Sequence, residues 1–182
     1  MIRELVNCND PILRQPLEKF DFTNPPTDPL ELAIDLAETC LQHNGLAIAA
    51  NQVGLPYRVF VIRGDQIITC FNPTIVDQSE ETIVLEEGCL SYPNLFVKVK
   101  RPKKIKVRYT EPDGNIVTQI FDGFTARVFQ HELDHLNGIV YTKRANRYHL
   151  EQAQKNATKI GAIGGGKPLT SEAKEILEWL QV

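Results

Sequence analysis

The sequence lacks the features that mark membrane-spanning, secreted and strongly charged proteins. No apolar run approaches the ~20 residues that a helix needs to cross a bilayer, and the first residues contain no long apolar core of a secretory signal. The few cysteines are too widely and irregularly spaced for a disulfide framework: Cys8, Cys40, Cys70 and Cys89. We therefore expect a reduced, cytoplasmic compartment, in which a cysteine can serve as a metal ligand. The net charge of −3 neither demands nor excludes an anionic partner.

The chain does have enough length and apolar content for a core. Its 182 residues, 42% of them hydrophobic, suit one globular domain over residues 1–182. The pattern predicts a polar helix over 143–160, a glycine-rich break at 164–168 and a last helix over 170–180. We expect residues 143–182 to form a helical extension of this domain.

Histidine is also scarce, yet two of the four histidines fall in one HExxH sequence within QHELDHLNG, residues 130–138. Apolar residues recur at helical spacing over 126–136, and the Asn-Gly pair that follows predicts the end of a helix. On a helix, His131 and His135 project from one face and can bind one metal ion, and Glu132 can act as a base without being a ligand. The alternative is a solvated helix face; the concentration of histidine in one box favours a metal site.

A helix is also expected in the N-terminal part, beginning after Asp28 as cap, with Pro29 in its first turn, and ending at Asn44-Gly45. The sequence GLAIAANQVG, residues 45–54, follows directly. Small residues ending in an amide suit a backbone that passes close to a ligand, and tight packing between helix and sheet is the alternative.

The middle of the chain is rich in β-branched and aromatic residues, which predict strands. We expect strands at 57–62, 67–71 and 82–85, a turn around Pro73, and a hairpin of 104–110 with 116–121. Cys40 and Cys70 fall within apolar patterns and are predicted core residues.

Residues 95–109 carry seven basic side chains: Lys98, Lys100, Arg101, Lys103, Lys104, Lys106 and Arg108. A nucleic-acid surface is one interpretation. Alternation with valine and isoleucine, without a repeated aromatic platform, favours the solvated face of a strand pair. We therefore predict no specific nucleic-acid partner.

A catalytic metal usually takes three protein ligands and keeps one position open, so HExxH needs a third ligand. A metzincin would have histidine where Tyr141 stands, so that pattern fails. A downstream glutamate is another formal choice without a supporting motif: Glu151, Glu172, Glu175 or Glu178. Cys89, beside glycine in the polar stretch EEGCLSYP, is the better chemical candidate. A thiolate with two neutral imidazoles suits zinc, iron(II) or nickel.

Three segments in this order, residues 45–52, 87–91 (EGCLS) and 130–138, resemble the three signature motifs of peptide deformylases. The resemblance spans at least residues 9–142. It implies an α+β fold in which antiparallel sheets surround a central HExxH helix, with an additional C-terminal helical segment.

The resemblance also implies roles for the motif residues. The implied metal ligands are Cys89, His131 and His135. Glu132 would be the general base, and the Gln52 amide and the Leu90 backbone N–H would meet the charge that develops on the substrate oxygen. The implied substrate is the N-formyl group on the methionine of new polypeptides, released as formate. The family commonly works with iron(II), and zinc or nickel forms are also found.

The methionine side chain of such a substrate needs an apolar pocket. By position, the candidates that line the substrate groove are Gly45, Leu46, Ala47, Leu85, Phe124 and Val128. The family usually has glycine where this chain has Ala47, and the added methyl group could narrow the groove or forbid a positive φ, which would alter substrate range. In some bacterial members a C-terminal helix contacts the ribosome. The basic excess at 143–159 is compatible with that, and a solvated helix explains it equally well.

Two rival functions remain open on the sequence alone. A zinc endopeptidase could use HExxH with a different third ligand, and Cys89→Ala would then be nearly silent. A non-catalytic metal-bound or ribosome-binding module would be unaffected by Glu132→Ala.

Overall fold

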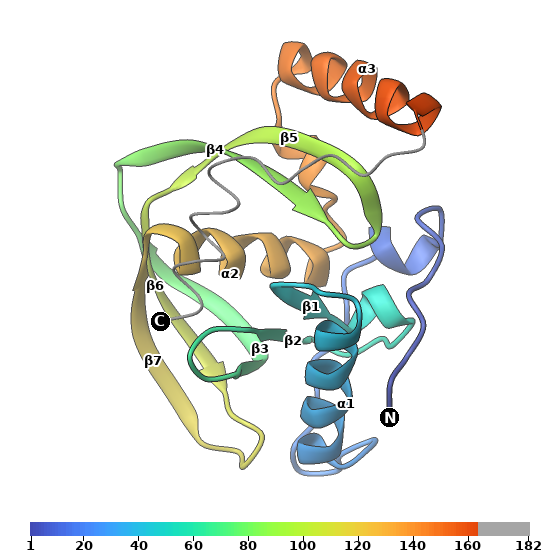
Figure 1. The fold of residues 1–182 in the computed structure, drawn as a ribbon. Coiled ribbons are helices and arrows are strands. Elements are labelled where there is room, and N and C mark those ends of the chain that lie inside the picture. Colours follow the sequence, from blue (N-terminus) through green and yellow to red (C-terminus); the bar gives the residue numbers. More distant parts are fainter. Residues whose placement is uncertain (164–182) are drawn as a thin grey trace.

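A computed structural model describes residues 1–163 (Figure 1). The helices are α1 (Pro29–Gln42), α2 (Gly123–Leu136) and α3 (Arg147–Ile163), with 3-10 turns η1 (Pro11–Arg14), η2 (Ala50–Val53) and η3 (Tyr141–Arg144). The strands are β1 (Ala47–Ala49), β2 (Val59–Ile62), β3 (Ile68–Gln78), β4 (Thr82–Cys89), β5 (Tyr92–Pro102), β6 (Lys104–Thr110) and β7 (Ile116–Asp122). The expected break at 164–168 and the last helix lie outside the described residues.

The architecture is α+β, and every strand pair is antiparallel. One sheet has the order β1-β2-β3-β6-β7, and β4 and β5 form a separate two-stranded ribbon. Helix α2 contacts strands of both sheets, and Figure 1 shows it running between the ribbon above and β1–β3 below. None of the described helices combines the length and apolar composition that crossing a bilayer requires.

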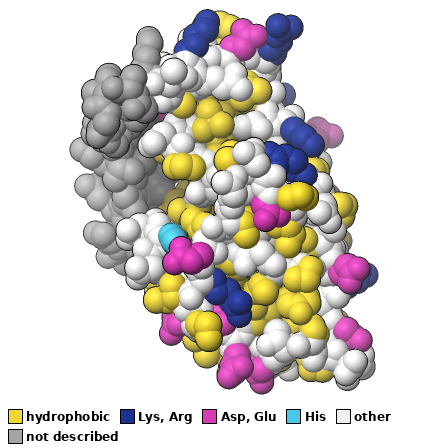
Figure 2. Space-filling view, turned by 90° about the vertical axis from the view of Figure 1, so that its right-hand side faces the viewer, with side chains coloured by type: hydrophobic (Ala, Val, Ile, Leu, Met, Phe, Trp, Pro, Cys, Tyr) yellow, Lys and Arg dark blue, Asp and Glu magenta, His cyan; other side chains and the backbone are white. Residues whose placement is uncertain are grey.

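Helix α1 begins and ends where the sequence predicts. The Asp28 side chain accepts a hydrogen bond from the Glu31 N–H at 2.9 Å, and Asn44 takes the left-handed conformation after the last turn. The inner stripe, including Cys40, packs against β1 and β2. Its outer side exposes Leu30, Ile34 and Leu41, and Figure 2 shows this face with apolar side chains among charged ones.

Helix α2 ends at the predicted Asn-Gly pair. Asn137 caps it, and Gly138 has φ +69°, a conformation that glycine adopts without strain. A Cβ on Gly138 would lie 2.6 Å from the Gln15 carbonyl carbon, so a side chain has no room there. Asn137 also forms a β-bridge with Pro16, which fixes the N-terminal segment against the end of the helix.

The predicted turn at Pro73 is wrong, because β3 continues through it. Asn72 has φ +50°, and the register with β6 shifts between Phe71 and Thr74, so the chain bulges without reversing. The Asn72 side chain is hydrogen-bonded to the Phe20 backbone at both ends of its amide. Its Oδ1 accepts from the Phe20 N–H at 2.8 Å, and its Nδ2 donates to the Phe20 carbonyl at 2.9 Å. Proline is tolerated at a bulge, where its missing N–H breaks no ladder bond.

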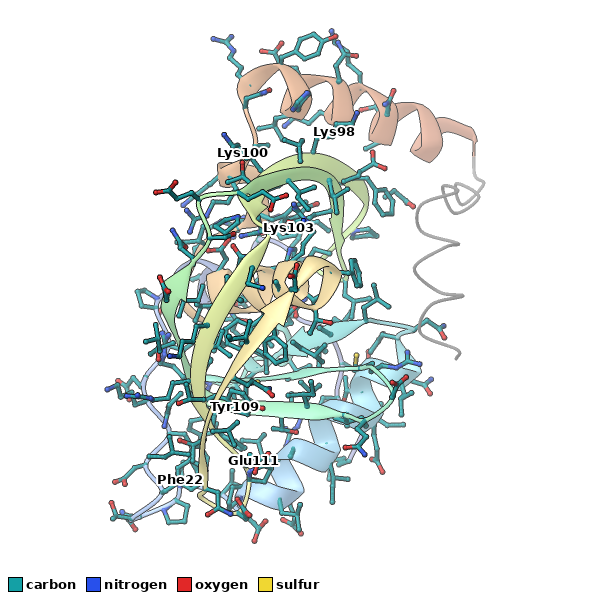
Figure 3. All side chains as sticks on the ribbon, turned by 90° about the vertical axis from the view of Figure 1, so that its left-hand side faces the viewer. Phe22, Lys98, Lys100, Lys103, Tyr109 and Glu111 are labelled. Atoms are coloured by element: carbon teal, nitrogen blue, oxygen red, sulfur yellow. The ribbon has the colours of Figure 1, made fainter. Side chains whose placement is uncertain are left out.

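The basic stretch forms strands, as predicted, but the two strands do not pair with each other. β5 pairs with β4, and β6 pairs with β7 in the predicted hairpin. Lys98 and Lys100 are exposed on β5 (Figure 3). The prediction of a solvated Arg101 is wrong, because its side chain is buried. The described part of the predicted extension, residues 143–163, contains the end of η3 and all of α3. Ala153 of α3 packs in a cluster with Val97 and Val99.

Candidate metal centre

Helix α2 and the end of β4 bring together three side chains that could bind a metal ion. His131 and His135 lie one turn apart on α2, and Cys89 is the last residue of β4. Their ligand atoms all lie within 4.8 Å of one another, with 3.2 Å between Cys89 Sγ and His135 Nε2. Within the described part of the chain, this is the cluster that could hold a metal ion. One sulfur and two imidazole nitrogens suit a catalytic divalent cation, which usually takes three protein ligands.

The ionisation of Cys89 also fits a ligand. Burial alone would raise the pKa of this thiol, but the adjacent imidazoles of His135 and His131 hold it well below its ordinary value. Metal ligation requires the thiolate, so the protein environment favours the form that a cation needs. Cys40 behaves differently, because burial raises the pKa of its thiol to about 12. Cys40 and Cys70 are fully buried, as predicted for core residues.

Glu87 orients one of the imidazoles. Its Oε2 lies 3.0 Å from His131 Nδ1, which leaves Nε2 of that ring available to a cation. Arg101 donates two hydrogen bonds to Glu87, at 2.6 and 2.9 Å, and Arg127 donates another at 2.6 Å. Burial opposes the charge on Glu87, but Arg101 and His131 hold its pKa well below the usual value. Glu87 is therefore ionised and fixed as an acceptor for His131.

Sequence reasoning misses this group of buried ion pairs. It gives Arg127 no role and places Arg101 on the solvated face of a strand pair. A signal for Arg101 is nevertheless present, because this residue has the same parity along β5 as the buried Val97 and Val99. The charge of Arg101 argues against burial from the sequence alone, although a paired arginine can be buried.

Glu132 is buried beside the two histidines and is 4% exposed. Within the described residues, its Oε2 has no hydrogen-bond partner. Burial raises the pKa of Glu132, while the neighbouring imidazoles oppose the shift. An oxygen that accepts no hydrogen bond from the described residues is suited to take a proton from a reacting group.

The small-residue segment reaches the same site through η2. Gln52 is buried, and its Nε2 donates to Ser91 Oγ at 3.1 Å and to Cys89 Sγ at 3.5 Å. Leu90 and Ser91 form the turn between β4 and β5, immediately after Cys89. A Cβ on Gly45 would lie 2.7 Å from Leu90 Cδ1, so the segment packs closely against this turn. Residues 45–52 therefore combine the two alternatives: Gly45 packs closely against Leu90, and the Gln52 amide is directed at Cys89.

The residues predicted to line the substrate groove do not all share one cavity. Leu46, Phe124 and Val128 line a cavity of about 870 Å³ beside the five-stranded sheet. The described residues that line it do not include Gly45, Ala47 or Leu85. Ala47 is a buried β1 residue paired with Ile62, and its φ is not positive, so the added methyl group forbids no required backbone conformation. Leu85 is half-buried on β4, paired with Val99.

Within the described residues, the other positions weighed from the sequence for the third ligand do not belong to this cluster. The Tyr141 hydroxyl donates to the Leu95 carbonyl at 2.5 Å, while its ring packs against His131. Glu151 is exposed and pairs with Arg147 on α3 at 2.8 Å. The remaining candidates lie outside the described residues: Glu172, Glu175 and Glu178.

Comparison with known proteins agrees with the geometry. The family model described as polypeptide deformylase matches residues 2–151. The chain belongs to the peptide deformylase family. The peptide deformylase of Thermotoga petrophila is 44% identical over 140 residues, which cover 74% of this chain and 82% of that protein. The peptide deformylase of Rhizobium meliloti is 34% identical over 177 residues, with coverage of 92% and 99%.

Solved peptide deformylases share the fold. A Met-Ala-Ser-bound class I type b peptide deformylase from Acinetobacter baumannii has a TM-score of 0.74 and 32% identity, covering 79% of this chain and 98% of that one. The Thermotoga maritima peptide deformylase has a TM-score of 0.72 and 38% identity, covering 80% and 99%.

Proposed function

We propose that this peptide deformylase holds one divalent cation on Cys89, His131 and His135 and uses it to remove the N-formyl group from the methionine of nascent polypeptides, releasing formate. The observation that carries the proposal is the convergence of the Cys89 sulfur on two imidazoles beside a buried glutamate. This ligand set accepts iron(II), zinc and nickel. We infer iron(II) as the working metal in the cell, as the resemblance to peptide deformylases implies, with zinc or nickel in preparations of the protein.

A cation held by Cys89, His131 and His135 would supply Lewis acidity at this site. Glu132 takes a proton from the attacking water and then delivers it to the departing amine. Its buried position and its Oε2 without a partner in the described chain support both roles. The two sheets packed against α2 hold this carboxylate and its neighbouring imidazoles in place.

Two donors stabilise the charge that develops on the formyl oxygen. Gln52 holds its amide with Oε1 accepting from the Ala49 N–H at 2.9 Å, which directs Nε2 toward Cys89. The backbone N–H of Leu90, in the turn after Cys89, is the second donor. Donors that are fixed before the reaction lower the barrier, because the protein does not have to reorganise around the charge.

Substrate selection depends on the space around these groups. The close packing of Gly45 against Leu90 supports a site that admits formyl and excludes longer acyl groups. Leu46, Phe124 and Val128 are the residues we propose to receive the methionine side chain, since Val128 lies one helical turn before Glu132 and borders the cavity. Leu85 and the backbone at Gly45 and Ala47 complete the groove in this proposal.

We also infer the wider setting of the enzyme. We infer one domain over residues 1–182, which is supported by core clusters with residues from β1 to α3. We infer a reducing cytoplasm, which is supported by the four free cysteines. Contact between the C-terminal segment and the ribosome is supported by exposed basic residues on α3, Arg147 and Lys155. Cosedimentation with ribosomes, compared with a form ending before α3, tests that contact.

The activity is tested by formate release from formyl-Met-Ala-Ser, with acetyl-Met-Ala-Ser as the control substrate. Protein prepared anaerobically should release formate from the first peptide only, and loss of activity in air would identify iron(II). No formate from metal-loaded protein under either condition would contradict the proposal.

A further inference from the structure

A chain of buried ion pairs connects the metal site to a residue outside the three motifs. We propose that Arg144 is a positioning residue for the metal ligand His131, acting through Asp134, Arg101 and Glu87. The inference rests on the proposed metal site. Arg144 lies on η3, between α2 and α3.

Each link in the chain is a short hydrogen-bonded contact. Arg144 donates to Asp134 through Nη2 at 2.6 Å and Nε at 3.2 Å. Arg101 donates to Asp134 Oδ2 at 2.8 Å through Nη1 and to Glu87 through its other two nitrogens. Glu87 accepts from His131 Nδ1 at 3.0 Å. The path from Arg144 to a cation on His131 therefore runs through Asp134, Arg101 and Glu87 in turn.

Burial makes these links sensitive to one another. The side chains of Asp134, Arg101 and Glu87 are only 4 to 6% exposed, whereas that of Arg144 is 46% exposed. Removing one partner of a buried ion pair leaves a charge without compensation, which costs far more than the loss of a surface pair. Arg144 is therefore the solvent-accessible end of an otherwise buried network of ion pairs.

The division of donors predicts the effect of removing Arg144. Asp134 accepts two of its three ion-pair bonds from Arg144 and one from Arg101. Without Arg144, the buried Asp134 carboxylate retains only Arg101, which shares its guanidinium with Glu87. Arg101 is then drawn toward Asp134, and Glu87 loses part of the support that holds it against His131. A less constrained imidazole releases its metal more readily.

The same chain contains a matched control. Arg147 lies three positions further on, at the start of α3, and pairs with Glu151 at 2.8 Å. Its side chain is 92% exposed, and the pair has no link to Glu87 or His131. Exposed pairs of this kind contribute little to stability.

The experiment measures zinc(II) dissociation from the loaded protein into a chromophoric chelator. Direct partners of a metal-binding histidine typically change metal affinity or activity by 10- to 100-fold, so for the more distant Arg144→Met we expect dissociation roughly 3- to 10-fold faster than wild type. Arg144→Lys, which keeps the charge but not the paired donors, should be intermediate, and Arg147→Met should match wild type. For the same Arg144→Met protein, kcat should fall while KM stays unchanged.

A double-mutant cycle separates positioning from general destabilisation. Glu87→Gln should accelerate dissociation by itself, and adding Arg144→Met should then have no further effect, because the path to His131 is already broken. An unchanged dissociation rate in Arg144→Met, or the same acceleration in the Glu87→Gln background, would overturn the proposal. Wild-type protein that retains no zinc would instead overturn the metal site itself, and this inference with it.

Discussion

The side-chain amide of Gln52 lies against the sulfur of Cys89, with 3.5 Å between Nε2 and Sγ, although the two residues are 37 positions apart. The bond from the Ala49 N–H to Gln52 Oε1 fixes which end of the amide faces the sulfur. A short turn of 3-10 helix thus presents a hydrogen-bond donor to a site whose ligands come from other elements. In the proposed mechanism, this amide is what the first motif contributes to the reaction.

Replacing this amide should slow catalysis without releasing metal. We expect Gln52→Ala to reduce kcat by about two to three orders of magnitude, the usual effect of removing one donor to a developing oxyanion. Gln52→Glu has the same shape but places an acceptor where Nε2 donates, so it should not restore activity. Formate release and metal content are measured on the same preparations. Activity within a few-fold of wild type in Gln52→Ala would remove the amide from the mechanism.

Glu132 should be essential for turnover and dispensable for metal binding. Glu132→Ala and the isosteric Glu132→Gln are expected to retain metal and to lose roughly two to four orders of magnitude in rate, because a positioned base contributes that much. Elemental analysis gives the metal content, and formate release gives the rate. Full formate release in either variant would remove Glu132 from the mechanism.

Cys89 should decide between the deformylase site and an HExxH endopeptidase. Cys89→Ala removes the sulfur from a three-ligand site, so metal retention after dialysis should fall severely and activity should fall with it. Cys40→Ala is the matched control, since Cys40 lies in the core outside the ligand cluster. A Cys89→Ala protein with normal metal content would exclude the sulfur as a ligand.

Alkylation of the metal-free protein should report the lowered pKa of Cys89. A depressed pKa keeps the reactive thiolate populated below the ordinary titration range, so labelling of Cys89 by iodoacetamide should be nearly constant from about pH 6 to 8. An ordinary thiol gains about tenfold in rate per pH unit below its pKa of about 8.5. Cys40 and Cys70 should stay unlabelled, because they are buried and burial raises the pKa of both. Mass spectrometry of the digested protein measures each site, and an ordinary pH dependence at Cys89 would refute the shift.

The local features of this chain were predictable because their causes are local. The ends of α1 depend on Asp28 and Asn44, and the end of α2 depends on Gly138, all visible in the sequence. The continuation of β3 through Pro73 was not predictable, because Asn72 is held by the distant backbone of Phe20. Tertiary contacts of this kind leave no periodic signal.

The site was predictable to the same extent. The motifs identified Cys89, His131 and His135, which the structure brings together. The residues that support them come from three elements: Arg101 from β5, Arg127 from α2 and Arg144 from η3. Their pairing with Glu87 and Asp134 depends on how those elements pack, which a single sequence does not reveal.

The most direct test of the account is X-ray absorption at the metal edge of the zinc-loaded protein. We expect one zinc per chain, with one sulfur at about 2.3 Å and two imidazole nitrogens at about 2.0 to 2.1 Å in the coordination shell. A wild-type shell of nitrogen and oxygen alone would contradict the account.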